Sequence, residues 1–285
     1  MRKRGTFRLS SLVPLIAFII IFLFFTIVSK GKMLSGYNLK TLLEQSMVII
    51  VGGCGALFVV AQGSIDMSIG VNLALSGVVG MWVSTVTNVP ILFIPATLVS
   101  GAIVGLFNGA VVSKLKVPSF ILTISMLIGL RGVVTFIQTK IGTSYLAPSL
   151  SILNSTGVKM AIFFVIVIIM AYVFEFTKAG RYSQAIGENE TVAKYVGVPV
   201  AKMKILAFTL SGLMAGAAAI FSIITVGGTS QTMGSFTEMK VAMAIFLGGV
   251  LVTGGTSAKI YKMLLGSFSI TIIVNGLAII GYPQT

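Results

Sequence analysis

Residues 62–70 read Q-G-S-I-D-M-S-I-G and place a carboxylate between two long apolar segments. Asp66 is one of only six acidic residues in the chain, and Ser64 and Ser68 flank it at a spacing of two. A carboxylate among apolar segments is costly to bury and by default suggests a function. Residues 62–70 are either a turn in which Asp66 is solvated or a broken helix inside a bundle. In the second case the two serines could cap a helix that restarts toward Val71.

Other polar side chains lie within the apolar segments and are candidate functional groups for the same reason. Arg131 could pair with a carboxylate across a bundle or extend toward the interface. Asn108 and Asn275 stand beside glycines, where interhelical hydrogen bonds explain them as well as ligand contacts do. Glu175, near Lys178, reads as a solvated charge at a helix end. The candidates for lining a path are Ser64, Asp66, Ser68, Asn72, Asn108, Phe120, Arg131 and Asn275.

Several kinds of chemistry are absent from the sequence. The chain has no histidine and one cysteine, Cys54, so a disulfide within the chain is impossible and a zinc site is not expected. The phosphate-binding pattern G-x-x-x-x-G-K-S/T is missing, so we expect no nucleotide or other cofactor on this chain. Without histidine or a nucleophile–base pair, an enzyme is not expected either.

The elements that position these residues are membrane helices. The 285 residues are 56% hydrophobic and only 9% charged, with a mean hydropathy of +1.07. Soluble domains carry about 25% charged residues. The composition therefore predicts an all-α, polytopic membrane helix bundle that forms one transmembrane domain over residues 1–285. We expect nine spans, at about 12–29, 41–61, 69–87, 91–113, 118–138, 160–176, 205–226, 240–257 and 263–281.

The basic residues predict the orientation. If the spans alternate from a cytoplasmic N-terminus, thirteen Lys and Arg residues fall in inside loops and six in outside loops. The net charge of +14 is then explained by topology, and no basic run is interleaved with aromatic residues as nucleic-acid binding would require. The basic N-terminus and the first apolar run read as a retained helix, not a cleaved signal peptide.

The inside loop at 177–204 holds a short helix. Asn189 is a suitable N-cap, Glu190 suits the first turn, and Gly197 followed by Pro199 marks the end. Val192, Tyr195 and Val196 share one face. A helix of barely two turns must pack on something. It either folds onto its own bundle or docks a soluble cytoplasmic subunit.

A family resemblance rests on an ordered series of motifs along nearly the whole chain. The loop R-Y-S-Q-A-I-G-E-N-E-T-V-A-K-Y-V-G-V resembles the cytoplasmic loop of the sugar-type ABC importer permeases, the ribose and galactose permease family. The same family resemblance holds, in order, for N-L-K-T-L-L-E-Q-S, G-S-I-D-M-S-I-G, F-N-G-A-V-V-S-K-L-K-V-P-S-F-I-L-T and L-L-G-S-F-S-I-T-I-I-V-N-G-L.

The resemblance implies a permease subunit that imports a monosaccharide by alternating access across a bacterial inner membrane. Its implied partners are a cytoplasmic ABC ATPase that carries ATP and Mg²⁺, an extracytoplasmic solute-binding protein, and a second permease copy or homologue. The implied ATPase-docking residues are Ala185, Ile186, Gly187, Glu188, Asn189, Glu190, Val192, Tyr195 and Gly197. Because the family keeps the acid at the position of Asp66, the resemblance favours the broken helix, with Asp66 as a structural or gating carboxylate.

The chain departs from the family pattern at two places. The family usually continues for about one more span, to about ten, and it usually has Asp at the position of Lys240, which weakens the prediction of the solute. A nucleoside or a furanose signalling molecule is the alternative cargo. An ion-coupled secondary transporter is a remote alternative, because ion coupling usually requires several buried acids along a path.

Overall fold

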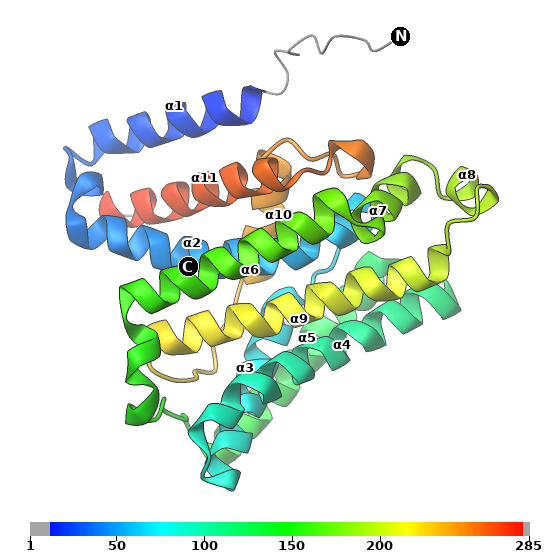
Figure 1. Ribbon diagram of the computed structural model, residues 1–285. Helices are drawn as coiled ribbons and strands as arrows, with labels where there is room; N and C mark the ends of the chain where they lie inside the picture. The colour runs from blue at the N-terminus through cyan, green and yellow to red at the C-terminus, as the bar shows by residue number, and fades with distance from the viewer. Residues whose placement is uncertain (1–11, 282–285) are drawn as a thin grey trace.

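The computed structural model describes residues 12–281, which fold into a bundle of helices (Figure 1). In chain order the α-helices are α1 (Val13–Val28), α2 (Gly36–Ala61), α3 (Ile69–Thr87), α4 (Phe93–Leu115), α5 (Ser119–Ile141), α6 (Thr156–Phe176), α7 (Lys178–Glu188), α8 (Glu190–Tyr195), α9 (Val200–Val226), α10 (Thr237–Leu247) and α11 (Ile260–Ile279).

The helices confirm the predicted membrane bundle. Among the described residues, seven helical segments are long and apolar enough to cross a bilayer. The helix α1 is also apolar but has only 16 residues. The basic residues predicted at the cytoplasmic N-terminus, Arg2, Lys3, Arg4 and Arg8, lie outside the described residues.

The predicted span at 240–257 is wrong as a single helix. The helix α10 has 11 residues, a length of about 16 Å, whereas a bilayer core is about 30 Å thick. Beyond it the chain is irregular up to α11, with positive φ angles at Gly249, Gly254 and Gly255. Residues 248–259, which we call the α10–α11 connection, include a short 3₁₀ turn at Gly255–Ser257. Hydropathy over this segment could not distinguish a short helix followed by buried irregular chain from a full span.

The centre of the bundle is formed by α2 and α9, which are the most buried of the long helices. The helix α9 packs against α4 with almost no side chain between the two backbones. A Cβ atom built on Gly105 would meet the carbonyl oxygen of Phe208, and one on Gly212 would meet that of Gly101. The repeated small residues of α4, at 101, 105 and 109, allow this close approach.

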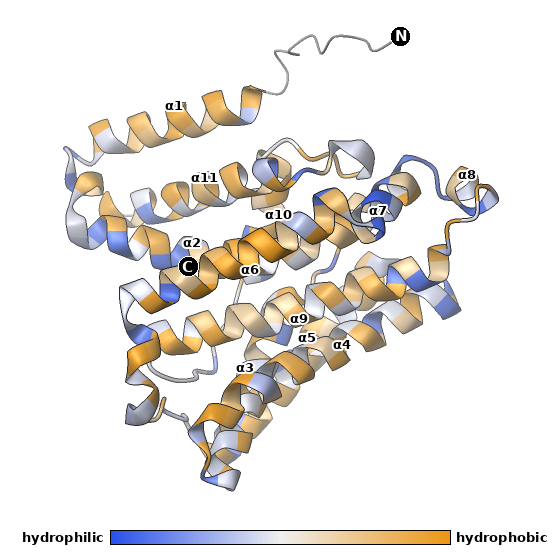
Figure 2. Ribbon diagram, viewed as in Figure 1, coloured by the Kyte–Doolittle hydropathy of each residue, from blue (hydrophilic) through white to orange (hydrophobic). Residues whose placement is uncertain are grey.

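The helices alternate in direction, so their connections gather at two ends of the bundle (Figure 1). One end carries α7, α8, the α4–α5 turn and the α10–α11 connection. We call it the α7–α8 end. Hydrophilic residues concentrate on α7 and at the helix ends, whereas the long helices are mainly hydrophobic (Figure 2).

Candidate translocation and docking sites

Asp66 is the centre of a buried hydrogen-bond network. Its side chain is 6% exposed. Its Oδ1 accepts from the backbone N–H of Ser68 at 2.9 Å and from the Ser68 hydroxyl at 2.6 Å. Its Oδ2 accepts from the Ser211 hydroxyl of α9 at 2.8 Å. Asn108 of α4 donates from Nδ2 to the Ser68 hydroxyl at 2.9 Å. The carboxylate thus joins the start of α3 to α4 and α9.

The backbone around Asp66 is also tied to α5. The N–H of Ile65 donates to the Ser119 hydroxyl at 3.3 Å, and the N–H of Met67 donates to the Thr123 hydroxyl at 3.0 Å. This arrangement is the broken helix inside the bundle, and the solvated turn is excluded. The capping expectation is wrong, because Ser68 occupies the N-cap position of α3 without a side-chain capping bond. Its hydroxyl is engaged by Asp66 and Asn108 instead.

Replacing Asp66 with Ala should destabilise the bundle. The change removes three hydrogen bonds to a carboxylate and leaves the Ser68 and Ser211 donors buried without a partner, at a cost on the order of 3 kcal/mol. Asp66→Asn retains an acceptor for Ser68, and the Ser211 hydroxyl can turn to accept from the new amide. This variant should therefore lose less stability than Asp66→Ala. Thermal unfolding of the purified chain in detergent measures the difference. Equal stability of wild type and Asp66→Ala would contradict the structural role.

The other path candidates are dispersed. Asn72 donates to the Gly101 carbonyl at 3.1 Å and accepts from Ser76 at 3.0 Å, so it holds α3 against α4. Asn275 is buried in α11. Ser64 and Phe120 instead line a cavity of about 830 Å³ at the α7–α8 end. The structure therefore brings Asp66, Ser68 and Asn108 together and places the other candidates elsewhere.

Arg131 contacts backbone rather than a carboxylate. Its Nη1 donates to the carbonyl oxygen of Met233 at 2.9 Å and, less closely, to that of Gln231 at 3.4 Å. Among the described residues Arg131 forms no ion pair within 4 Å, so the pairing alternative is not the one that the structure shows. The guanidinium fixes the connection that precedes α10 onto α5.

The helix α8 forms as the sequence predicts at both ends. Asn189 Oδ1 accepts from the N–H of Val192 at 3.0 Å. At the other end Gly197 has φ +87°, and the N–H of Val198 reaches the carbonyl of Ala193 at 3.0 Å. This is a Schellman motif, which satisfies carbonyls that the helix end would otherwise leave free.

The apolar face of α8 points away from the bundle. Val192 is 55% exposed, Tyr195 86% and Val196 74%. The helix is held from the opposite side by the buried Ala193, which packs in a small cluster with Ile186 and Val198. The alternative in which Val192, Tyr195 and Val196 fold onto the chain's own bundle is therefore wrong.

The helix α7 is anchored to the α10–α11 connection. Gly187 lies so close to Ala61 and Gly255 that a Cβ atom would overlap their backbone. Glu188 Oε1 accepts from the Thr256 N–H at 2.7 Å and from its hydroxyl at 2.6 Å. Gly187 and Glu188, two of the nine predicted docking residues, thus face the bundle, whereas the apolar face of α8 points outward.

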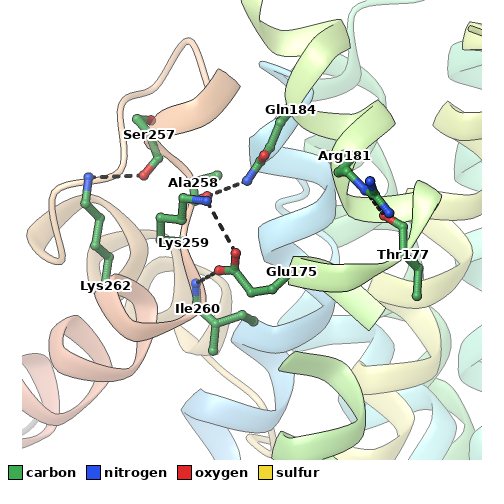
Figure 3. A network of polar contacts seen from close by, with 9 residues as sticks. All are labelled: Glu175, Thr177, Arg181, Gln184, Ser257, Ala258, Lys259, Ile260 and Lys262. Atoms are coloured by element: carbon green, nitrogen blue, oxygen red, sulfur yellow. Dashed lines mark hydrogen bonds and ion pairs between the residues drawn. The ribbon is translucent and has the colours of Figure 1, made fainter. Parts of the chain in front are cut away.

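A second set of contacts joins the same elements near the α6–α7 bend (Figure 3). Glu175 Oε1 accepts from the N–H of Ile260 at 3.3 Å, and its Oε2 pairs with Lys259 at 3.3 Å. Gln184 Nε2 donates to the Ala258 carbonyl at 2.9 Å. Glu175 is thus a partner of the start of α11, not merely a solvated charge. The sequence reading missed Gln184 and Thr256, although the sequence G-G-T-S at 254–257 was a visible turn signal.

The contact between Glu188 and Thr256 should depend on pH. The two hydrogen bonds from Thr256 hold the pKa of the Glu188 carboxyl below its ordinary value of 4.5. A lowered pKa means that the contact is complete above about pH 4.5 and weakens as the pH falls through the folded-state pKa. Hydrogen-exchange protection of residues 254–258, corrected for intrinsic rates, should be constant from neutral pH to pH ~5 and fall below that. Glu188→Gln should remove this dependence, and an unchanged dependence in that variant would contradict the assignment.

Within residues 12–281, no group of three or more His, Cys, Asp or Glu side chains lies close enough to hold a metal ion.

The described residues form few ion pairs. Lys159 is buried and pairs with Glu44 of α2 and with Asn154. This pair lies at the end opposite α7 and α8.

Comparisons with known proteins agree on the family. The family described as "Branched-chain amino acid transport system / permease component" matches residues 38–285. The chain is 30% identical to the ribose import permease protein of Escherichia coli (strain K12), over 86% of this chain and 78% of that protein. It is 29% identical to the fructose import permease protein of Rhizobium meliloti, over 94% and 78% of the two chains.

A further relative is the autoinducer 2 import system permease protein of Enterobacter sp. (strain 638), which is 32% identical over 88% of this chain and 74% of that protein. No solved structure matches the chain. The family match and these relatives agree with the helical membrane bundle described above. The chain therefore belongs to the sugar-type ABC importer permeases of the branched-chain transport permease family.

Proposed function

We propose that this chain is the membrane-spanning subunit of an ATP-driven importer that carries a monosaccharide-like solute into the cytoplasm by alternating access. The α7–α8 end is cytoplasmic, and because α1 starts beside the α10–α11 connection at that end, we place the N-terminus on the cytoplasmic side as well. ATP and Mg²⁺ are bound by a separate ABC ATPase, which docks on α8. A solute-binding protein delivers the cargo at the opposite end, and a second permease copy or homologue completes the path.

The observation that carries this proposal is the outward face of α8. Val192, Tyr195 and Val196 form an apolar patch on a helix whose other side is fixed, and exposed apolar patches on rigid supports mark protein interaction sites. The docking residues that face inward, Gly187 and Glu188, connect this patch to α2 and to the α10–α11 connection. Movement of a docked ATPase would therefore act on elements that reach the centre of the bundle.

The network around Asp66 supports a structural role for the carboxylate rather than an ion site. The carboxylate is already satisfied by Ser68 and Ser211, and residues 62–68 lie between the end of α2 and the start of α3. Both oxygens of this buried carboxylate are engaged by serines, and Asp66 does not line the cavity at the α7–α8 end, which does not favour ion-coupled transport. This leaves Asp66 as a positioning residue for a bent segment beside the path.

The nature of the cargo rests on the relatives. Ribose, fructose and autoinducer 2 appear in their names, so a pentose or hexose is our first proposal and a furanose signalling molecule or nucleoside the second. Ligand profiling of the cognate solute-binding protein distinguishes these, because that protein selects the cargo before the permease receives it.

Co-purification tests the function itself. A tagged chain extracted in mild detergent from its native membrane should carry a stoichiometric ATPase, and ATP hydrolysis should appear only in that complex. A chain that purifies alone and still drives solute accumulation would contradict the proposal.

A further inference from the structure

The cavity at the α7–α8 end is strongly basic. Four lysines and one acid line its volume of about 830 Å³: Lys116, Lys194, Lys202, Lys204 and Glu190. Lys204 is neutralised by Glu190, whose two oxygens accept from Nζ at 2.9 and 2.8 Å. Among residues 12–281, Lys116, Lys194 and Lys202 have no hydrogen bond or ion pair. The cavity therefore has three uncompensated ammonium groups.

Lys116, Lys194 and Lys202 lie at helix ends, where we expect the headgroup layer of a membrane. The helix α9 has 27 residues and is about 40 Å long, whereas the hydrocarbon core is about 30 Å thick. This length leaves about 10 Å of α9 outside the hydrocarbon, and we assign part of this excess to the first turns, which carry Lys202. Lys116 lies in the turn between α4 and α5, at the same end.

Part of the remaining wall of the cavity is apolar and continues onto the exposed surface of α5. Val117, Pro118 and Phe120 line the cavity. Phe120 is itself 47% exposed, and Ile121 follows it on the largely unburied helix α5. A ligand in this cavity thus meets ammonium groups on one side and an apolar surface leading along a membrane helix on the other.

We propose that this cavity binds an anionic phospholipid, with its phosphate at Lys116, Lys194 and Lys202 and its acyl chains along Phe120 and the exposed face of α5. Basic pockets between membrane helices on the cytoplasmic side suit such headgroups. A free inorganic anion would use the lysines but not the apolar wall. A bound lipid would join α8, which carries the exposed apolar patch, to the α4–α5 turn, next to the Asp66 network. The proposal does not depend on the identity of the transported solute.

Lipid binding to the purified full-length chain tests this proposal. Native mass spectrometry should show phosphatidylglycerol retained in preference to phosphatidylcholine, with the preference falling as salt rises. The triple variant Lys116→Gln, Lys194→Gln, Lys202→Gln should bind phosphatidylglycerol more weakly by about five-fold per lysine, roughly 100-fold in total. These lysines are exposed, so the variant should fold normally.

The matched control is Lys30→Gln, Lys32→Gln, Lys40→Gln, which removes three exposed lysines at the opposite end and should change phosphatidylglycerol binding less than about twofold. Equal binding of the two lipids, or full retention by the triple variant, would overturn the proposal. Displacement of the lipid by millimolar inorganic phosphate would show a free-anion site instead and would also overturn it. A triple variant that loses ATPase association while its lipid binding is unchanged would overturn the proposal as well.

Discussion

The variant Gly212→Val should fail to assemble a stable helix bundle. Gly212 lies where α9 crosses α4, and a Cβ atom there would overlap the Gly101 carbonyl oxygen and come within 2.8 Å of the Gly105 backbone. Two backbones in contact have no side chain that can rotate away, so the helices must separate. Overpacking of a core typically costs 1–3 kcal/mol, and forced separation of two central helices places this variant at about 3 kcal/mol or more.

The matched control for this prediction is Gly129→Val. Gly129 also lies within a membrane helix, α5, but nothing lies within 4 Å of a Cβ atom built on it. Both variants make the same change in helix propensity. The difference in stability between them therefore reports on the α4–α9 contact. Size-exclusion profiles and thermal unfolding in detergent provide the comparison. Similar stability of the two variants would show that the backbones of α4 and α9 are not in contact.

The double variant Val192→Asp, Tyr195→Asp should lose its ATPase while keeping its fold. Both side chains are exposed and contribute little to the chain's own packing. Buried interface anchors typically contribute about 2 kcal/mol or more each, so the pair should weaken association roughly 1,000-fold. Uptake should fall in parallel, because ATP hydrolysis is no longer coupled to the bundle.

The control for the docking prediction carries the same charge change at the other end of the molecule. Leu34→Asp with Tyr37→Asp alters an exposed apolar pair beside the start of α2. This variant should retain the ATPase. Co-purification of each variant measures the effect, and equal recovery of ATPase with both would exclude α8 as the docking element.

Local features of the fold could be predicted because they depend on neighbouring residues. The apolar lengths indicated the long helices, and the caps of α8 at Asn189 and Gly197 could be read from residue type alone. The break after α10 was not predicted, because Val250, Leu251 and Val252 continue the apolar run beyond the first glycine pair. The pairs Gly248–Gly249 and Gly254–Gly255 were a signal against a continuous helix.

The candidate site could be predicted only in part, for a related reason. Asp66 was identified from its cost in an apolar environment, but its partner Ser211 lies 145 residues away. No local pattern indicates that α9 passes beside residues 62–68. Likewise, the exposed face of α8 was visible as a periodicity, whereas its anchoring through Gln184, Glu188 and Thr256 depends on a connection between two distant helices.

Site-directed cross-linking from α8 tests the central claim most directly. The chain has a single, buried cysteine, Cys54, so a Cys54→Ala background allows one label at Tyr195→Cys or, as a control, at Tyr37→Cys. A benzophenone attached at position 195 in native membranes should yield a product that contains peptides of this chain and of an ABC ATPase. The label at position 37 should yield no ATPase adduct. The absence of an ATPase adduct at position 195, or equal adducts at both positions, would contradict the account.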